Sequence, residues 1–168
     1  ILNNIGLKNN LNFYFKNLNS VGKNVSTYKN SPQIEAQSLI EINSELPLNK
    51  ITEFNNQTII PRISLRINPG DMKNHNSDER KVNTDNIFDI NRLGIEDSLE
   101  SGYSLTAGFD FRSENRTDSD KFVQFKLASV FRNQEESNIP TQTSLNKKNS
   151  NIFGSFDYGL SKNVNLDY

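Results

Sequence analysis

The sequence predicts an all-β protein, an antiparallel up-and-down meander of about seven strands that forms part of a large transmembrane β-barrel. Three observations predict it: apolar and polar residues alternate through most segments, helical periodicity is weak, and long and short connectors follow one another. Of the 168 residues only 33% are hydrophobic, yet 10% are aromatic, with no Trp. No apolar run has the length of a transmembrane helix, whereas a barrel strand needs only about ten alternating residues.

Seven segments alternate as strands do. The third has apolar side chains on one face and two arginines on the other, and the fourth, 103–112, alternates over ten residues without error. Because no helix separates the segments, neighbouring segments are expected to pair in antiparallel fashion. The segments comprise residues 11–16, 34–42, 59–67, 103–112, 123–131, 152–160 and a last one from about Asn163.

The connectors differ in length in a regular way. Residues 17–32, 69–102 and 132–150 form long polar links, and 112–121 and 160–163 form short ones. Outer-membrane barrels have long external loops and short periplasmic turns, so the first, third and fifth strands are expected to run outward. The link from Glu45 to Thr58 is an exception, because it should be a tight turn but is not.

The polar faces of the predicted strands carry candidate lumen-facing residues. Cations in a lumen would favour the passage of a phosphate-bearing ligand. Alternatively, the three arginines form ion pairs with Asp110, with Asp157 or with a plug inside the lumen. The candidates are Arg62, Arg66, Asp110, Arg112, Lys126 and Asp157.

Two other classes of protein fit the alternation. A secreted β-sandwich, such as an adhesin or a carbohydrate-binding module, has the same period with its apolar face turned to a core. A porin-like outer-membrane channel fits as well. The net charge of −1, without a basic patch, makes nucleic acid an unexpected partner. We expect residues 1–168 to be a partial outer-membrane barrel domain, with a signal peptide and a periplasmic domain outside this stretch.

No catalytic or metal site is predicted, and no cofactor is expected. The chain has no Cys, and its only histidine, His75, lies in a polar loop where we expect it to be solvated. Acid pairs such as Asp118 and Asp120 could bind calcium or serve a glycosidase, but no spacing matches an EF-hand loop. The protein is therefore not expected to be an enzyme.

The second half of the longest connector has a recognisable motif. Residues 86–102 read NIFDINRLGIEDSLESG. The order of their distinctive residues resembles that in the C-terminal barrel domain of the family of LPS-assembly proteins called LptD (OstA family), and the strand from Pro61 to Pro69 is similar too. Where many relatives have an acid followed by Arg after the glycine, this sequence has Glu-Asp-Ser, and the cysteines of many members are absent from it. The motif residues are Phe88, Asn91, Arg92, Gly94, Glu96, Asp97 and Gly102.

The resemblance implies a translocon in the outer membrane of a Gram-negative bacterium that inserts lipopolysaccharide into the outer leaflet. The implied partners are lipopolysaccharide, an LptE-like plug lipoprotein, periplasmic LPS-bridge proteins such as LptA, and outer-membrane lipid. The motif loop is expected to lie outside the membrane, where it either helps to cap the lumen or only folds itself. Within it, Arg92 is expected to donate to loop carbonyls or to Asp89 and Glu96, and Gly94 to permit a positive φ.

Overall fold

The computed structural model describes residues 6–23, 30–162 and 164–168, and within them all strands belong to one eight-stranded antiparallel sheet. A single 3-10 turn, Thr141–Thr143, lies in a connector. The strands are β1 (Lys8–Ser20), β2 (Gln33–Glu45), β3 (Leu48–Ile51), β4 (Asn55–Asn68), β5 (Gly102–Asn115), β6 (Phe122–Arg132), β7 (Phe153–Ser161) and β8 (Val164–Asp167). All-β class and up-and-down meander are thus confirmed.

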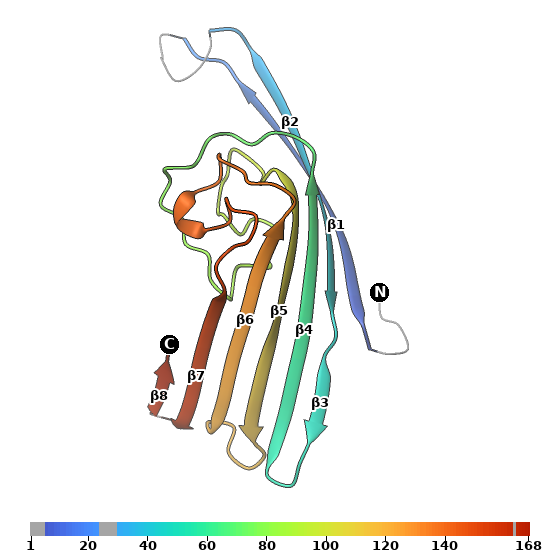
Figure 1. Cartoon of the computed structure of the whole chain (residues 1–168), viewed down its shortest axis with the longest axis vertical. Coiled ribbons are helices and arrows are strands. Elements are labelled where there is room, and N and C mark those ends of the chain that lie inside the picture. Colours follow the sequence, from blue (N-terminus) through green and yellow to red (C-terminus); the bar gives the residue numbers. More distant parts are fainter. Residues whose placement is uncertain (1–5, 24–29, 163) are drawn as a thin grey trace.

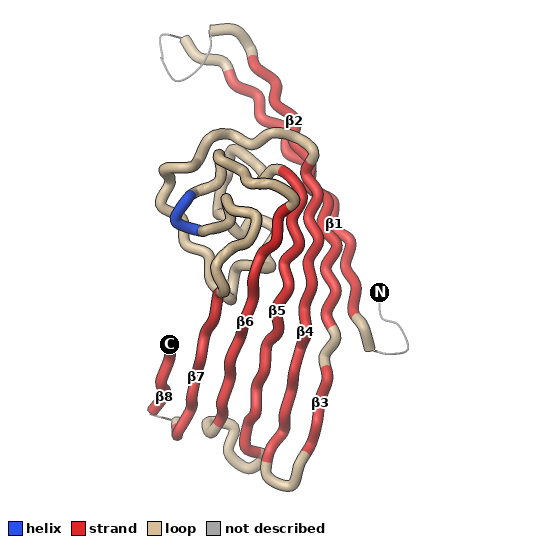
Figure 2. Tube along the Cα trace, in the orientation of Figure 1, coloured by secondary structure: helices blue, strands red, loops and turns tan. Residues whose placement is uncertain are grey.

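The strands lie side by side in chain order, β1-β2-β4-β5-β6-β7-β8, with β3 paired to β4 beyond the end of β2. The prediction of a loose link between Glu45 and Thr58 was wrong, because β3 and the first residues of β4 form most of that link and the chain reverses within Thr52–Asn55. There, the Thr52 amide donates to the Asn55 carbonyl at 2.8 Å. The sheet is open, with β1 and β8 at its edges (Figure 2).

Long and short connectors lie at opposite ends of the sheet (Figure 1). Residues 69–101 and 133–152 fold together at one end, where the β1–β2 connector also lies; residues 24–29 of that connector are outside the described part. The turns at 52–54 and 116–121 lie at the other end. This is the arrangement that the connector lengths predict.

The apolar face of the sheet is exposed. Residues opposite each other in antiparallel strands share a face, and Leu65, Leu105 and Phe131 form one such row across β4, β5 and β6. These three side chains are 37%, 39% and 45% exposed. On β1 and β2 the row continues with Ile42 and Leu11, also exposed.

The polar face of the sheet, in contrast, is covered at the end that carries the long connectors (Figure 1). Glu41, Arg66, Ser104 and Arg132 form a row on β2, β4, β5 and β6, and all four are buried. A β-sandwich buries the apolar face of each sheet against the other sheet. The polarity here is the reverse, which disfavours the sandwich alternative.

Residues 69–101 and 133–152, called the lid below, cover this polar face (Figure 1). The hydrophobic core lies mostly within the lid; of the described sheet residues, Ala128 and Val130 belong to it and Phe153 packs against it. Leu39 on β2 is buried as well, outside this cluster. The lid residues of the core are Met72, Val82, Ile87, Phe88, Leu93, Ile95, Ile139 and Leu145.

Among the residues described, no helix is long and apolar enough to cross a membrane.

Candidate functional site

The motif loop folds locally as a series of tight turns. The amide of Gly94 donates to the Asn91 carbonyl at 2.9 Å, and the Asn91 side chain accepts the Ile95 amide at 3.1 Å. Gly94 has a φ of +62°, as predicted, and Gly102, where β5 begins, has a φ of +81°. Both angles lie in the left-handed region, where a Cβ atom adds strain. These residues therefore set the path of the loop that places Arg92.

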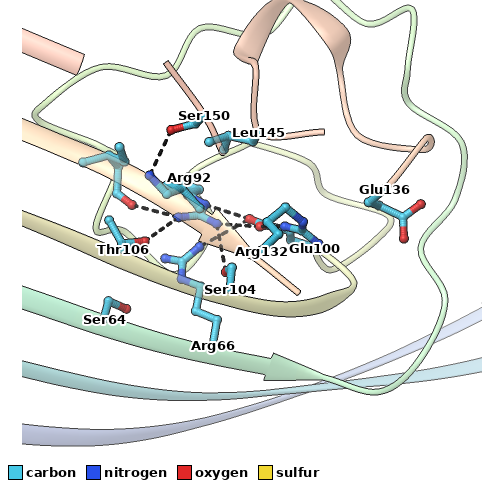
Figure 3. A network of polar contacts seen from close by, with 12 residues as sticks. Ser64, Arg66, Arg92, Glu100, Ser104, Thr106, Arg132, Glu136, Leu145 and Ser150 are labelled. Atoms are coloured by element: carbon cyan, nitrogen blue, oxygen red, sulfur yellow. Dashed lines mark hydrogen bonds and ion pairs between the residues drawn. The ribbon is translucent and has the colours of Figure 1, made fainter. Parts of the chain in front are cut away.

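Arg92 is completely buried, and its side chain forms a bidentate pair with Glu100 (Figure 3). Nε lies 2.8 Å from Glu100 Oε2, and Nη2 lies 2.5 Å from Oε1. The guanidinium also donates to the hydroxyls of Ser104 and Thr106 on β5, at 3.1 and 2.8 Å, and to the Ile87 carbonyl at 3.4 Å. A loop carbonyl is thus a partner, as predicted.

The prediction that the Arg92 side chain pairs with Asp89 and Glu96 was wrong. Glu100, four residues beyond Glu96 and two before β5 begins at Gly102, takes that place. Glu96 lies elsewhere, with its carbonyl accepting the side chain of Lys16 on β1. Asp89 contributes its backbone carbonyl instead, as an acceptor for the side chain of Arg66.

Two strand arginines converge on the same carboxylate. Arg132 Nη1 on β6 lies 2.5 Å from Glu100 Oε1, and Arg66 Nη1 on β4 lies 3.5 Å from Glu100 Oε2. Arg132 also donates to the Ser101 carbonyl. Arg66 pairs with Glu41 on β2 as well, with its Nε 3.0 Å from Oε1. Three arginines and two glutamates are therefore buried together with a net charge of +1, and they join β2, β4 and β6 to the lid.

The charge state of Glu100 follows from its neighbours. Burial by itself would raise its pKa, but the charges of Arg92, Arg66 and Arg132 and the hydrogen bonds of Arg92 outweigh burial and lower the pKa from 4.5 to about 2. The carboxylate is thus ionised at neutral pH. Removing one partner from such a buried cluster is strongly destabilising, because it leaves an uncompensated charge.

Below the lid the polar face carries ion pairs that remain partly exposed. Arg62 lies 3.5 Å from Asp110, and Lys126 lies 2.6 Å from Asp85 of the lid. Arg112 pairs with Glu114 at 3.0 Å instead of with an acid of another strand. Of the expected pairs with Asp110 or Asp157, the pair of Arg62 with Asp110 is thus seen, whereas Arg66 pairs with Glu41 on β2.

The candidate lumen-facing residues differ in how far their side chains are exposed. Arg66 is 2% exposed and is covered by the chain's own lid, whereas the side chains of Arg62 and Arg112 are 30% and 37% exposed. Asp157 is half-buried on β7, opposite Gln124, on the same face as Arg112. The structure thus separates one covered arginine from an accessible polar surface.

The rim of the lid is held by weaker contacts to the sheet. Lys73 lies 3.1 Å from Glu35 on β2 and 3.5 Å from Asp97. Burial would lower the pKa of Lys73, but hydrogen bonds and charges from Glu35 and Asp97 raise it. Lys16 on β1 donates to the Glu96 carbonyl at 2.7 Å. Exposed pairs of this kind contribute little stability.

His75 is not solvated, contrary to the sequence-based prediction. Its side chain is 13% exposed, with Nδ1 3.0 Å from Asp78 and Nε2 3.1 Å from Asp97. The polar neighbours in sequence gave no sign of this, because Asp97 comes from the far end of the loop. No group of His, Cys, Asp and Glu residues in the described part of the chain has the arrangement of a metal site.

Sequence reasoning missed Glu41, Glu100 and Arg132. Glu41 and Arg132 lie on polar faces by the same alternation that placed Arg66 there. Arg132 also ends β6, where a long connector begins, whereas Glu41 lies nearer the short link to β3. The alternation was thus an available signal for both. Glu100 lies in the loop, where no period applies, and only its closeness to Gly102 and the new strand pointed to it.

Comparison with known proteins identifies the family. The family model described as LptD, LPS transport system D, matches residues 36–168. Neither the curated proteins nor the solved structures give a match. The matched stretch contains the whole lid, most of β2 and all strands from β3 to β8, and thus all five ions of the network. The chain belongs to the LptD family of the LPS transport system.

Proposed function

We propose that this chain is a segment of the outer-membrane translocon that inserts lipopolysaccharide into the outer leaflet. The family's general role in LPS transport supports this proposal, and it favours a translocon over a porin-like channel. An LptE-like lipoprotein would plug the lumen, and a periplasmic bridge protein such as LptA would deliver the lipid. Unpaired strand edges are too costly in hydrocarbon, so further strands of a larger barrel must pair with β1 and β8.

The reversed polarity of the sheet carries the proposal. In a membrane barrel the exposed apolar face contacts lipid and the polar face lines the lumen. The exposed apolar side chains on β1, such as Phe13 and Phe15 at 67% and 62%, then lie in the hydrocarbon. The lid covers the lumenal face at the end with the long connectors, which supports the cap role of the motif loop.

The accessible part of the polar face is the proposed contact surface for the polar part of lipopolysaccharide or for the plug lipoprotein. Arg62 and Arg112 supply planar donors suited to phosphate groups there. Arg66 is not part of this surface, because it is buried beneath the lid.

The orientation is tested by labelling single cysteines with a membrane-impermeant maleimide on intact cells. A cysteine at Lys147 in the lid is expected to be labelled. A cysteine at Thr117, in the turn at the opposite end, is expected to react only after the outer membrane is permeabilised. The reverse pattern would contradict the proposed orientation.

The function is tested in cells depleted of the native protein and supplied with full-length variants. We expect R62Q/R112Q to lower surface lipopolysaccharide while the barrel still shows heat-modifiable migration. R116Q, which removes a cation from an exposed turn, is the matched control and should leave the level unchanged. An unchanged level of surface lipopolysaccharide in R62Q/R112Q would show that these arginines have no role in transport. An unchanged level when the native protein is depleted would refute the translocon role.

A further inference from the structure

The lid is built as a body of its own. Eight of its side chains form most of the hydrophobic core. Its two loops also bind each other directly: Ser101 donates to Glu136 at 2.6 Å, the His75 amide to the Asn138 carbonyl at 2.9 Å, and the Thr141 amide to the Asn76 carbonyl at 3.1 Å. The two loops therefore contact each other directly and not only through the sheet.

The seam between lid and sheet is mainly polar. Gln37 on β2 accepts the Leu99 amide at 2.6 Å, Thr84 donates to Ser155 on β7 at 3.1 Å, and Lys126 pairs with Asp85. Of the described sheet residues, Ala128, Val130 and part of Phe153 pack in the apolar core, and Leu39 on β2 is buried outside it. Water can replace polar partners when such a seam opens, whereas an apolar seam would expose surface that water disfavours.

Glu100 is the strongest link across this seam. It belongs to the lid, and two of its three arginine partners, Arg66 and Arg132, belong to the sheet. The third, Arg92, belongs to the lid and donates to Ser104 and Thr106 on the sheet. Glu41 is the other buried acid of the cluster, but its contacts lie within the sheet, on Arg66, Ser64, Asn12 and Asn43.

Backbone pairing limits where the lid can hinge. The Arg132 amide donates to the Lys148 carbonyl at 2.7 Å, and the Ser150 amide donates to the Val130 carbonyl at 2.9 Å. Residues 148–150 are thus fixed to β6. On the other loop, Gly102 with its positive φ stands where the lid returns to β5.

We propose that the lid, apart from residues 148–150, is a stopper that moves as one body, and that Glu100 is the latch that holds it on the lumenal face. The proposal rests on the proposed function, in which this end of the lumen must open for the polar part of the lipid. On opening, Glu100 leaves with the lid, and Arg66 remains paired with Glu41. The exposed surface is then a polar strand face and not a hydrophobic core.

The latch is tested in the full-length protein in its membrane, with Val130→Cys as a reporter. Val130 is 0% exposed, lies on the sheet beneath the lid and has no part in the ionic cluster. In the V130C background we expect E100Q to increase labelling by an impermeant maleimide at least about tenfold, because a hydrogen-bonded buried charge contributes enough for a change of that order. E41Q removes the other buried acid of the cluster, and its labelling should stay near that of the parent.

Equal labelling in E100Q and its V130C parent would overturn the latch, as would equal labelling in E100Q and E41Q, which would mean general loosening. Heat-modifiable migration shows whether each variant has a folded barrel. If E100Q does not fold, R132Q is used in its place, because it removes one partner of Glu100 on the sheet. Raised labelling of R132Q would support the latch, and unchanged labelling would overturn it. Labelling reports the lid alone, so surface lipopolysaccharide, measured in parallel, separates failure of the latch from failure of the translocon role.

Discussion

Arg62 of the sheet lies over the ring of Phe88 in the lid, with its Cζ atom 4.2 Å from the ring centroid. Phe88 belongs to the family motif and is 9% exposed within the core of the lid. Arg62 also pairs with Asp110 on β5. One aromatic ring thus joins the apolar core of the lid to the charged surface below it.

Phe88→Ala is expected to loosen the lid strongly. Truncating a buried Phe costs about 3–5 kcal/mol, and the lost cation–π contact adds about 0.5–1 kcal/mol. Trypsin digestion of the detergent-solubilised full-length protein measures this, because Arg80 and Lys81 lie in the lid. Phe88→Leu keeps an apolar side chain and should give intermediate cleavage. Parental cleavage of Phe88→Ala would show that the ring does not hold the lid.

Gly108→Ala is expected to disrupt the pairing of β5 with β6. A Cβ atom at Gly108 would lie 2.4 Å from the Leu127 carbonyl oxygen and 2.8 Å from the Ala128 Cβ atom. Backbone cannot move away cheaply inside a sheet. Gly154→Ala is the matched control, since its nearest contact is a flexible leucine methyl group at 3.1 Å. The yield of heat-modifiable protein should fall for the first variant and not for the second.

Ile63→Lys and Arg62→Lys test which face meets the membrane. Ile63 is 52% exposed on the apolar face, and Arg62 is its neighbour on the polar face. A lysine on the lipid face near the midplane costs about 2–4 kcal/mol, whereas a lysine on the lumenal face keeps the existing charge. Folding into lipid vesicles should therefore be impaired only by Ile63→Lys. Equal folding of both variants would contradict the assignment of the faces.

The pH dependence of the lid should follow Glu100. Its pKa is lowered from 4.5 to about 2, so the charged carboxylate stabilises the closed lid above pH 4.5, and this contribution is lost as the pH falls from 4.5 through 2. The shift corresponds to roughly 3 kcal/mol. Pepsin cleavage of the lid, normalised at each pH to cleavage of an unfolded substrate, should rise over this window.

The same measurement on E100Q provides the control. In that variant the lid should be cleaved readily at pH 4.5 and show a smaller further rise on acidification, because the titrating group is gone. A parental profile in E100Q would show that Glu100 does not cause the acid transition.

The local sequence pattern was sufficient to predict the strands and which residues share a face of the sheet. The alternation in 103–112 predicted β5, and because side chains alternate by geometry alone, it also predicted that Leu105 and Arg112 lie on opposite faces. The positive φ of Gly94 was predicted in the same way, from a turn that requires it. The weak point was the link from Glu45 to Thr58, where β3 is too short for its alternation to be recognised.

The sequence by itself determined an all-β meander with one apolar and one polar face, and its motif determined the family. Only the tertiary structure decided that the polar face is covered by the chain's own lid, that Glu100 is the partner of Arg92, and that His75 is enclosed by Asp78 and Asp97. The physical reason is distance along the chain. Strand alternation is set by neighbouring residues, whereas the buried ion pairs join residues up to 34 positions apart, such as Arg66 and Glu100, which meet only when the loop folds over the sheet.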